Sequence, residues 1–267
     1  MNHGLRLATD PAYRTLRREA RELRRHRETT QRIVAASAAV LWDATKGSVA
    51  AGPFKGRRYI QVSEGSAWAP KLSGTYELEL NPVIGQIIAS GATRIIDIGA
   101  AEGYDAVGLA WKLPQARMIA FEAVEEAHPL IQELATANAV ASRLSVRGFC
   151  TPETLAGVLF DDERSVVICD VEGAEAGLLD PQRAIGLRKA HILVELHPWV
   201  SDGIGQRLRD RFEPTHSIAE ISTSPRTMTD WPAALVTALA PAAALACMDE
   251  MRPCPMTWFW ICPRQAG

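Results

Sequence analysis

Residues 93–98 have the pattern of a buried strand, and this strand runs straight into a glycine-bearing turn and a helix. Three isoleucines flank Asp97, a composition typical of a strand that is covered on both faces. Gly99 and Gly103 follow, where the missing Cβ atom lets the backbone turn sharply or come close to a ligand. Apolar residues at helical spacing then continue to residue 111. In α/β folds, such a strand–turn–helix unit is where nucleotide-like ligands bind, beside the helix N-terminus.

The spacing of the glycines indicates which ligand this turn suits. A dinucleotide fingerprint needs glycines at relative positions one, three and six, but counting from Gly99 these positions hold Gly99, Ala101 and Tyr104. A P-loop is excluded because no Gly-Lys-Ser/Thr follows. The pattern Asp97-x-Gly99-x-x-x-Gly103 instead resembles the first motif of class I S-adenosylmethionine (SAM) methyltransferases. Their ligand has no pyrophosphate for the turn to wrap, and Ala101 stands where their usual middle glycine would be.

Strands and helices alternate from residue 93 onward, which predicts a parallel sheet with right-handed crossovers. The expected strands span residues 93–98, 117–122, 144–149, 166–170 and 191–196, and the expected helices span about 104–113, 127–139 and 203–212, with shorter ones from 152 and from 174. The tail is expected to hold strands at 215–222 and 255–261, with helical segments at 231–239 and 242–248 between them. The last strand follows no long crossover helix, so we expect it to enter antiparallel. This resembles the Rossmann-like, seven-stranded α/β sheet of class I methyltransferases, with order 3-2-1-4-5-7-6 and helices on both faces.

Length and composition are those of a globular protein with a substantial core. The 267 residues suit one large α/β domain or a domain with an extension, and their 47% apolar and 22% charged residues are ordinary values. The net charge of −2 gives no overall attraction to nucleic acid or to a membrane, and no apolar run approaches the ~20 residues of a membrane helix. Five scattered cysteines without a Cys-x-x-Cys pair suit reduced thiols. We therefore expect a cytoplasmic protein with no membrane partner.

Residues 1–74 are expected to form a helical and loop extension ahead of a domain at 75–267. Residues 11–45 have helical spacing and carry eight arginines interleaved with glutamates. This pattern suits an anion- or RNA-binding arm, or a solvated helix laid on the domain or on a second subunit, which leaves a homo-oligomer through this helix open. Residues 46–74, with an expected short strand at 58–62, suit a lid or a connector packed by its own aromatic side chains. A helix is then expected at residues 75–90.

Carboxylates stand at the expected carboxyl ends of two strands. Glu122 ends the second strand, where an acidic side chain accepts hydrogen bonds from ribose hydroxyls. A NAD enzyme would place an acid similarly, so Glu122 indicates a ribose-bearing ligand without naming it. Asp170 ends the fourth strand and should face the cleft, with Glu172 and Glu175 close behind it. Glu175 suits a helix start as well as a functional role, because a carboxylate is favoured in a first turn.

Glu195 and His197 lie two residues apart near the end of the fifth strand, so they are expected on the same side of it. One interpretation makes His197 the general base for an acceptor hydroxyl, oriented by Glu195 or Asp170. A second has Asp170, Glu195 and His197 hold a divalent metal, although none is assigned. A third is purely structural: Glu195 pairs with backbone donors and His197 only ends the strand before Pro198.

Several blocks in order resemble the FkbM-type methyltransferases. They cover about residues 75–200 and comprise Asp97–Ala100 with Gly103–Tyr104, Ala120–Glu122, Asp170–Glu175 and Glu195–His197. The family usually continues Glu-Pro after the second strand, whereas this chain has Ala123. The resemblance implies SAM-dependent transfer of a methyl group, usually to a hydroxyl oxygen of a sugar, glycan or other natural product.

The expected site residues follow from these blocks and from position in the fold. Four residues would border the methionine part of SAM: Gly99, Ala100, Glu102 and Gly103. Glu122 would bind ribose, Gly148 or Cys150 would lie near the adenine by position alone, and Tyr76 would cover the ligand. Asp170 would face the methionine ammonium or the acceptor, and the expected catalytic residues are His197, Asp170 and Glu195. Two rival functions are an NAD(P)-binding oxidoreductase, which the glycine spacing opposes, and an RNA-binding SAM-fold protein that uses the arginine-rich helix.

Overall fold

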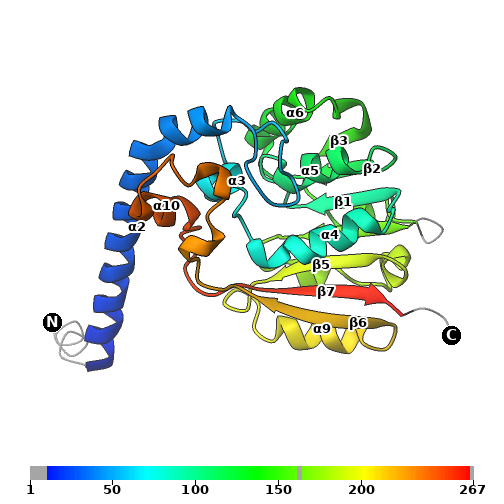
Figure 1. The fold of residues 1–267 in the computed structure, drawn as a ribbon. Coiled ribbons are helices and arrows are strands. Elements are labelled where there is room, and N and C mark those ends of the chain that lie inside the picture. The colour runs from blue at the N-terminus through cyan, green and yellow to red at the C-terminus, as the bar shows by residue number, and fades with distance from the viewer. Residues whose placement is uncertain (1–10, 161–163, 265–267) are drawn as a thin grey trace.

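One seven-stranded sheet organises the computed structural model, which describes residues 11–160 and 164–264 (Figure 1). The strand order is β3-β2-β1-β4-β5-β7-β6. The strands are β1 (Arg94–Ile98), β2 (Arg117–Phe121), β3 (Leu144–Arg147), β4 (Ser165–Cys169), β5 (His191–Leu196), β6 (His216–Ser222) and β7 (Thr257–Pro263). The first five are parallel to one another, and β7 is antiparallel to both β5 and β6. The predicted strand order and the antiparallel last strand are therefore confirmed.

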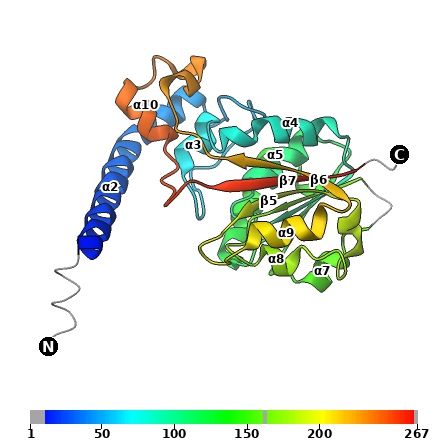
Figure 2. The ribbon, with the colours of Figure 1, turned by 90° about the horizontal axis from the view of Figure 1, so that it is seen from below.

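The helices cover both faces of the sheet, as Figure 2 shows for α4 and α5 on one side and α7, α8 and α9 on the other. Their bounds are α2 (Pro11–Thr45), α3 (Trp68–Ser73), α4 (Asn81–Ala89), α5 (Tyr104–Lys112), α6 (His128–Ala137), α7 (Pro152–Ala156), α8 (Glu175–Leu178), α9 (Ile204–Phe212) and α10 (Pro241–Met248). The side chains of β1 point alternately to the two faces of the sheet, which explains why helices are needed on both faces. Ile95 packs into the core beneath α4, α5 and α6, whereas Ile96 and Ile98 pack into the core beneath α7, α8 and α9.

The sheet register places the ends of the central strands at one edge. Ile98, the last residue of β1, pairs with Phe121 of β2 and with Cys169 of β4. The segments that follow these three strands therefore start side by side. Because open α/β sheets bind ligands beyond the carboxyl ends of their strands, this edge is where a site is expected.

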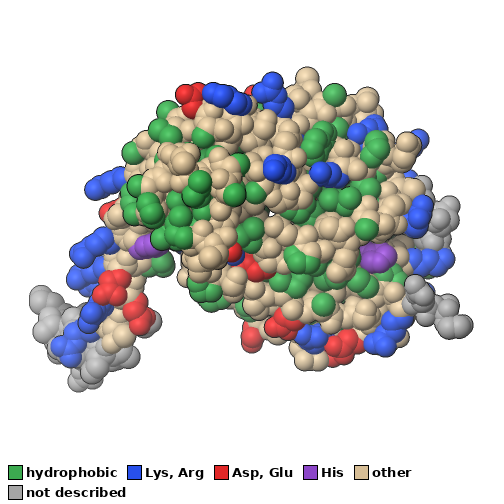
Figure 3. Space-filling view, viewed as in Figure 1, with side chains coloured by type: hydrophobic (Ala, Val, Ile, Leu, Met, Phe, Trp, Pro, Cys, Tyr) green, Lys and Arg blue, Asp and Glu red, His purple; other side chains and the backbone are tan. Residues whose placement is uncertain are grey.

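Helix α2 leaves the domain as a long arm (Figures 1 and 2). Its C-terminal half packs against α3 and α10 and buries Leu41, and His26 Nε2 lies 2.6 Å from Asp249 Oδ2. Basic and acidic side chains stand together along the exposed arm in Figure 3, and all the basic ones in α2 apart from His26 are arginines. Arg18 pairs with Glu22 there at 2.8 Å. Within the described residues, no helix combines the length and hydrophobicity that crossing a membrane requires.

Three expected elements differ from the structure. Residues 58–62 form no strand, since Arg58 makes only an isolated bridge with Ser48 and the segment lies as a covering loop. The segment 231–239 holds one 3₁₀ turn, Ala233–Leu235, rather than a helix, and the Leu235 carbonyl accepts from the Trp231 indole at 2.9 Å. The helix expected at 75–90 is divided, because Glu77 adopts φ 44° before the 3₁₀ turn Leu78–Leu80 and α4 begins at Asn81.

Candidate functional site

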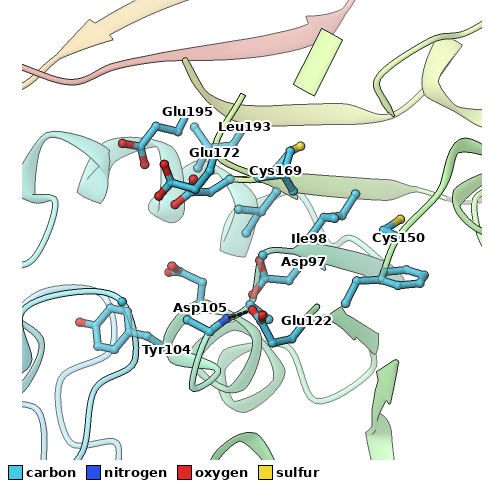
Figure 4. Close-up of a pocket in the computed structure, with 18 of the residues that line it drawn as sticks. Asp97, Ile98, Tyr104, Asp105, Glu122, Cys150, Cys169, Glu172, Leu193 and Glu195 are labelled. Carbon is cyan, nitrogen blue, oxygen red and sulfur yellow. Dashed lines mark hydrogen bonds between the residues drawn. The ribbon is translucent and has the colours of Figure 1, made fainter. Parts of the chain in front are cut away.

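A cavity of about 710 Å³ lies at the carboxyl edge of β1, β2, β4 and β5 (Figure 4). This volume is within the range of roughly 300–1,000 Å³ that small-molecule sites occupy. Residues 46–74, which we call the covering loop and which include the short helix α3, contribute part of its wall through Phe54, Glu64 and Lys71. The N-terminal segment therefore belongs to the site and to the core that packs around α5.

The turn after β1 forms the floor of the cavity through tight backbone packing. Gly99 has φ 86°, and a Cβ atom built there would lie 1.7 Å from the Asp170 carbonyl oxygen, so only glycine fits between the ends of β1 and β4. Ala101 also adopts a left-handed conformation, with φ 47°, where its Cβ costs about 1 kcal/mol. Its N–H donates to Glu122 Oε2 at 2.7 Å, which helps to hold that conformation. Gly99, Ala100 and Ala101 all line the cavity.

Glu122 presents a fixed carboxylate to the cavity from the end of β2. Its Oε2 accepts the Ala101 N–H and its Oε1 accepts the Val124 N–H at 2.8 Å (Figure 4 draws one of these bonds). The His128 ring nitrogen lies 2.8 Å from the Glu122 carbonyl oxygen and steadies the backbone. Each carboxylate oxygen can accept more than one hydrogen bond, so both remain able to accept a ligand hydroxyl.

Glu102 and Gly103 do not border the cavity, which corrects two expected ligand contacts. Glu102 has 0% exposure and turns away toward the covering loop, where its Oε1 lies 2.5 Å from Lys71 Nζ and 2.6 Å from the Tyr59 hydroxyl. Burial opposes its charge, yet Lys71 and these hydrogen bonds hold the pKa of Glu102 below its ordinary value. Gly103 instead starts α5, and a Cβ there would approach Ile131 at 3.2 Å.

Two other expected residues, Tyr76 and Cys150, do line the cavity. Tyr76 does so beside Tyr104, with ring centroids 5.6 Å apart. Cys150 follows β3 on the far side, and burial raises the pKa of its thiol to about 11, which keeps it protonated. Asp97 was identified in the sequence only as part of the motif. It also lines the cavity, and burial raises the pKa of its carboxyl.

His197 lies behind the cavity wall rather than in it. Its side chain is 2% exposed, and its Nδ1 hydrogen-bonds the fully buried Glu175 at 2.6 Å. Its Nε2 lies 3.5 Å from Asp170 Oδ1 and 3.3 Å from Glu172 Oε2, and these two carboxylates line the cavity. The prediction that His197 contacts the acceptor as a base is therefore wrong. β5 ends at Leu196, so the alternation of side-chain directions along the strand no longer applies at His197. Glu175 both starts α8 and holds His197.

Glu195 lines the cavity but lies in a different group. Its Oε1 accepts from Arg252 Nη1 at 2.6 Å, and Arg252 also pairs with Glu77 and Glu250. The alternative metal set of Asp170, Glu195 and His197 is thus not brought together; Glu172 takes the place of Glu195. The sequence offered no signal for Arg252, because its partners come from segments that are distant along the chain.

The cluster of Arg252 with Glu77, Glu195 and Glu250 predicts a free energy of unfolding that falls at alkaline pH. Burial raises the pKa of Glu195 to about 9 and that of Glu77 to about 8. Both folded-state values lie above the ordinary value near 4.3, so the stability that they contribute is complete below about pH 4 and is lost as the pH rises through 8 and 9. We expect the free energy of unfolding, measured by urea titration, to fall between pH 6 and 9.5.

The Glu195→Gln variant should show a smaller fall over that range, while Gln still accepts from Arg252. The exposed Glu126→Gln variant serves as control and should follow the wild type. An equal fall in Glu195→Gln and wild type would contradict the assignment.

Comparisons with known proteins give a likeness of fold. No family model matches the chain, and no curated protein matches it. Solved structures that match include the cofactor-bound Rv0187 from MTB (19% identity, 87% of this chain and 90% of that one, TM-score 0.45). Others are the O-methyltransferase from Bacillus cereus in complex with SAH (15%, 72% and 90%, 0.43) and the precorrin-6y C5,15-methyltransferase from Geobacter metallireducens (12%, 70% and 90%, 0.43). At these identities and scores, the likeness concerns the fold and says nothing of the reaction.

Proposed function

We propose that this chain is a SAM-dependent methyltransferase that transfers the methyl group directly, in line, to a hydroxyl oxygen of a sugar, glycan or other natural product. The observation that carries the proposal is the fixed carboxylate of Glu122 at the cavity, beside the glycine-bearing turn after β1. An acid in that position accepts both hydroxyl hydrogens of a ribose. The acceptor class rests on the resemblance of the sequence blocks to the FkbM-type family.

The turn and the charge of the cavity favour SAM over a dinucleotide. Tyr104 stands where the fingerprint needs its third glycine, and its ring packs against Phe54 and Tyr59 at centroid distances of 5.5 and 5.8 Å. Asp97, Asp105 and Asp170 line the cavity as well, and an acidic lining suits the positive sulfonium of SAM better than a negative pyrophosphate.

The reaction needs the methyl donor and the hydroxyl group to be positioned in line, and it needs a base that takes up the hydroxyl proton. The methyl carbon bonds to the acceptor oxygen as its bond to sulfur breaks, and the hydroxyl proton leaves. Asp170 is placed to take it: its side chain is 42% exposed while Oδ1 is buried, so Oδ2 is the oxygen that faces the cavity. Burial is the main cause that raises the pKa of Asp170, which makes it a stronger base than an exposed carboxylate. His197 and Glu175 act behind it as positioning residues.

A transfer assay tests this function. The full chain is incubated with methyl-labelled SAM and fractionated extract or glycans, and label is expected in a product that withstands mild alkali, as a methyl ether does. Asp170→Asn should lower the transfer rate by about 10²-fold, the typical contribution of a positioned base, while SAM still binds. Label found only in alkali-labile or amine products would contradict the hydroxyl acceptor, and an unchanged Asp170→Asn rate would contradict the base.

A further inference from the structure

Three metal-ligating atoms from two strand ends meet at the cavity wall. Asp170 and Glu172 follow β4, and His197 follows β5. One donor atom from each residue lies within 4.8 Å of the other two. The donors comprise an imidazole nitrogen and two carboxylate oxygens, which is a mixed set suited to first-row divalent metals.

The separations match those between neighbouring ligands of one ion. His197 Nε2 lies 3.3 Å from Glu172 Oε2 and 3.5 Å from Asp170 Oδ1. Metal–ligand bonds of about 2.1 Å place adjacent ligand atoms roughly 3.0 Å apart in octahedral and 3.4 Å apart in tetrahedral geometry. Neither contact is a hydrogen bond, and Asp170 Oδ1 is buried without any hydrogen-bond partner. A 98% buried imidazole thus directs Nε2 at two carboxylates without donating to either.

The imidazole is already held as a metal ligand requires. Glu175 Oε1 lies 2.6 Å from His197 Nδ1 and also accepts the Gly173 N–H at 2.9 Å. A carboxylate that binds the Nδ1 hydrogen fixes the ring orientation and leaves the Nε2 lone pair for the ion. Glu175 has 0% exposure, so this support is rigid and separate from solvent.

We propose that Asp170, Glu172 and His197 bind one divalent transition-metal cation, with the remaining coordination positions open to the cavity. Two carboxylates and one neutral imidazole supply the two negative charges that such an ion balances. The Glu172 side chain is 80% exposed and Asp170 lines the cavity, so the open positions face the space where an acceptor would sit. If the proposed methyl transfer holds, the ion would bind the acceptor oxygen and lower the pKa of its hydroxyl, and that consequence alone rests on the proposed function.

The test is direct binding of Mn²⁺ to the chelator-stripped full chain in the absence of SAM. Binding is measured as the loss of the electron paramagnetic resonance signal of the free ion. We expect one saturable site per chain, and competition by Zn²⁺. Glu172→Gln should weaken Mn²⁺ binding at least tenfold. The Glu172 side chain is exposed, so the change removes no buried packing, and an unchanged melting temperature checks this. The matched control is Glu64→Gln, which changes another cavity carboxylate outside the cluster and should bind as the wild type does.

Absence of saturable binding at millimolar Mn²⁺ would overturn the proposal and leave a protonated His197 between carboxylates. Equal affinity in Glu172→Gln and wild type would also overturn it. Because SAM takes no part in the titration, failure here is distinguishable from failure of the methyl-transfer assay.

Discussion

Replacing Lys71 with methionine is expected to lower the free energy of unfolding by about 3–5 kcal/mol, because the change leaves an uncompensated carboxylate in the interior. Lys71 is 3% exposed and its partner Glu102 is 0% exposed, with Nζ and Oε1 2.5 Å apart. Glu102 also accepts from the Tyr59 hydroxyl and from the Glu64 N–H at 3.0 Å. This group joins the covering loop of residues 46–74 to the start of α5, so the loop should loosen with it.

Two further variants separate the charge effect from lost packing. Lys71→Met combined with Glu102→Gln should recover most of the loss, since neither partner then carries a buried charge. Lys55→Met, at an exposed position of the same loop, should change stability by less than about 0.5 kcal/mol. Urea denaturation of the full chain measures all three. A Lys71→Met loss no larger than that of Lys55→Met would contradict the buried ion pair.

Replacing Glu122 with alanine is expected to weaken SAM binding by about 100-fold. Two hydrogen bonds from ribose hydroxyls to a carboxylate are lost, and hydrogen bonds to charged groups contribute about 1.5–3 kcal/mol each, part of which water recovers. Calorimetric titration with SAM gives the change in Kd. Glu122→Gln should have an intermediate effect, since the amide keeps one acceptor oxygen.

The same carboxylate holds the Ala101 and Val124 N–H groups, so stability has to be measured beside affinity. Melting temperatures identify any general loosening of the turn. Glu125→Ala, at an exposed position three residues further on and outside the cavity, is the control and should bind SAM normally. A folded Glu122→Ala protein that binds SAM within threefold of the wild type would exclude Glu122 as the ribose ligand.

The sheet could be predicted because its signals are local. β1 carries three isoleucines on alternating faces, and a strand buried on both faces needs apolar residues at every such position. The ends of the strands follow from the same runs, which is why Glu122 and Asp170 were placed at the cavity from sequence. A residue at the end of a parallel strand has its environment set by the sheet itself.

The remaining site residues depend on distant segments. Glu102 turns away from the cavity because it binds Tyr59 and Lys71, which lie more than thirty positions earlier in the chain. Glu195 is held by Arg252, which lies 57 positions further along the chain. His197 was expected on the same side as Glu195, but the strand ends one residue before it and Glu175 draws its ring behind the wall. No periodicity in the sequence encodes these choices.

Calorimetric titration of the full chain with SAM, beside the same titration with NADH, distinguishes the two cofactors. The cavity and its fixed Glu122 predict saturable binding of one SAM per chain and no saturable binding of NADH. Saturable NADH binding with no heat of SAM binding would exclude SAM as the ligand, because the turn after β1 would then hold a dinucleotide in spite of Ala101 and Tyr104.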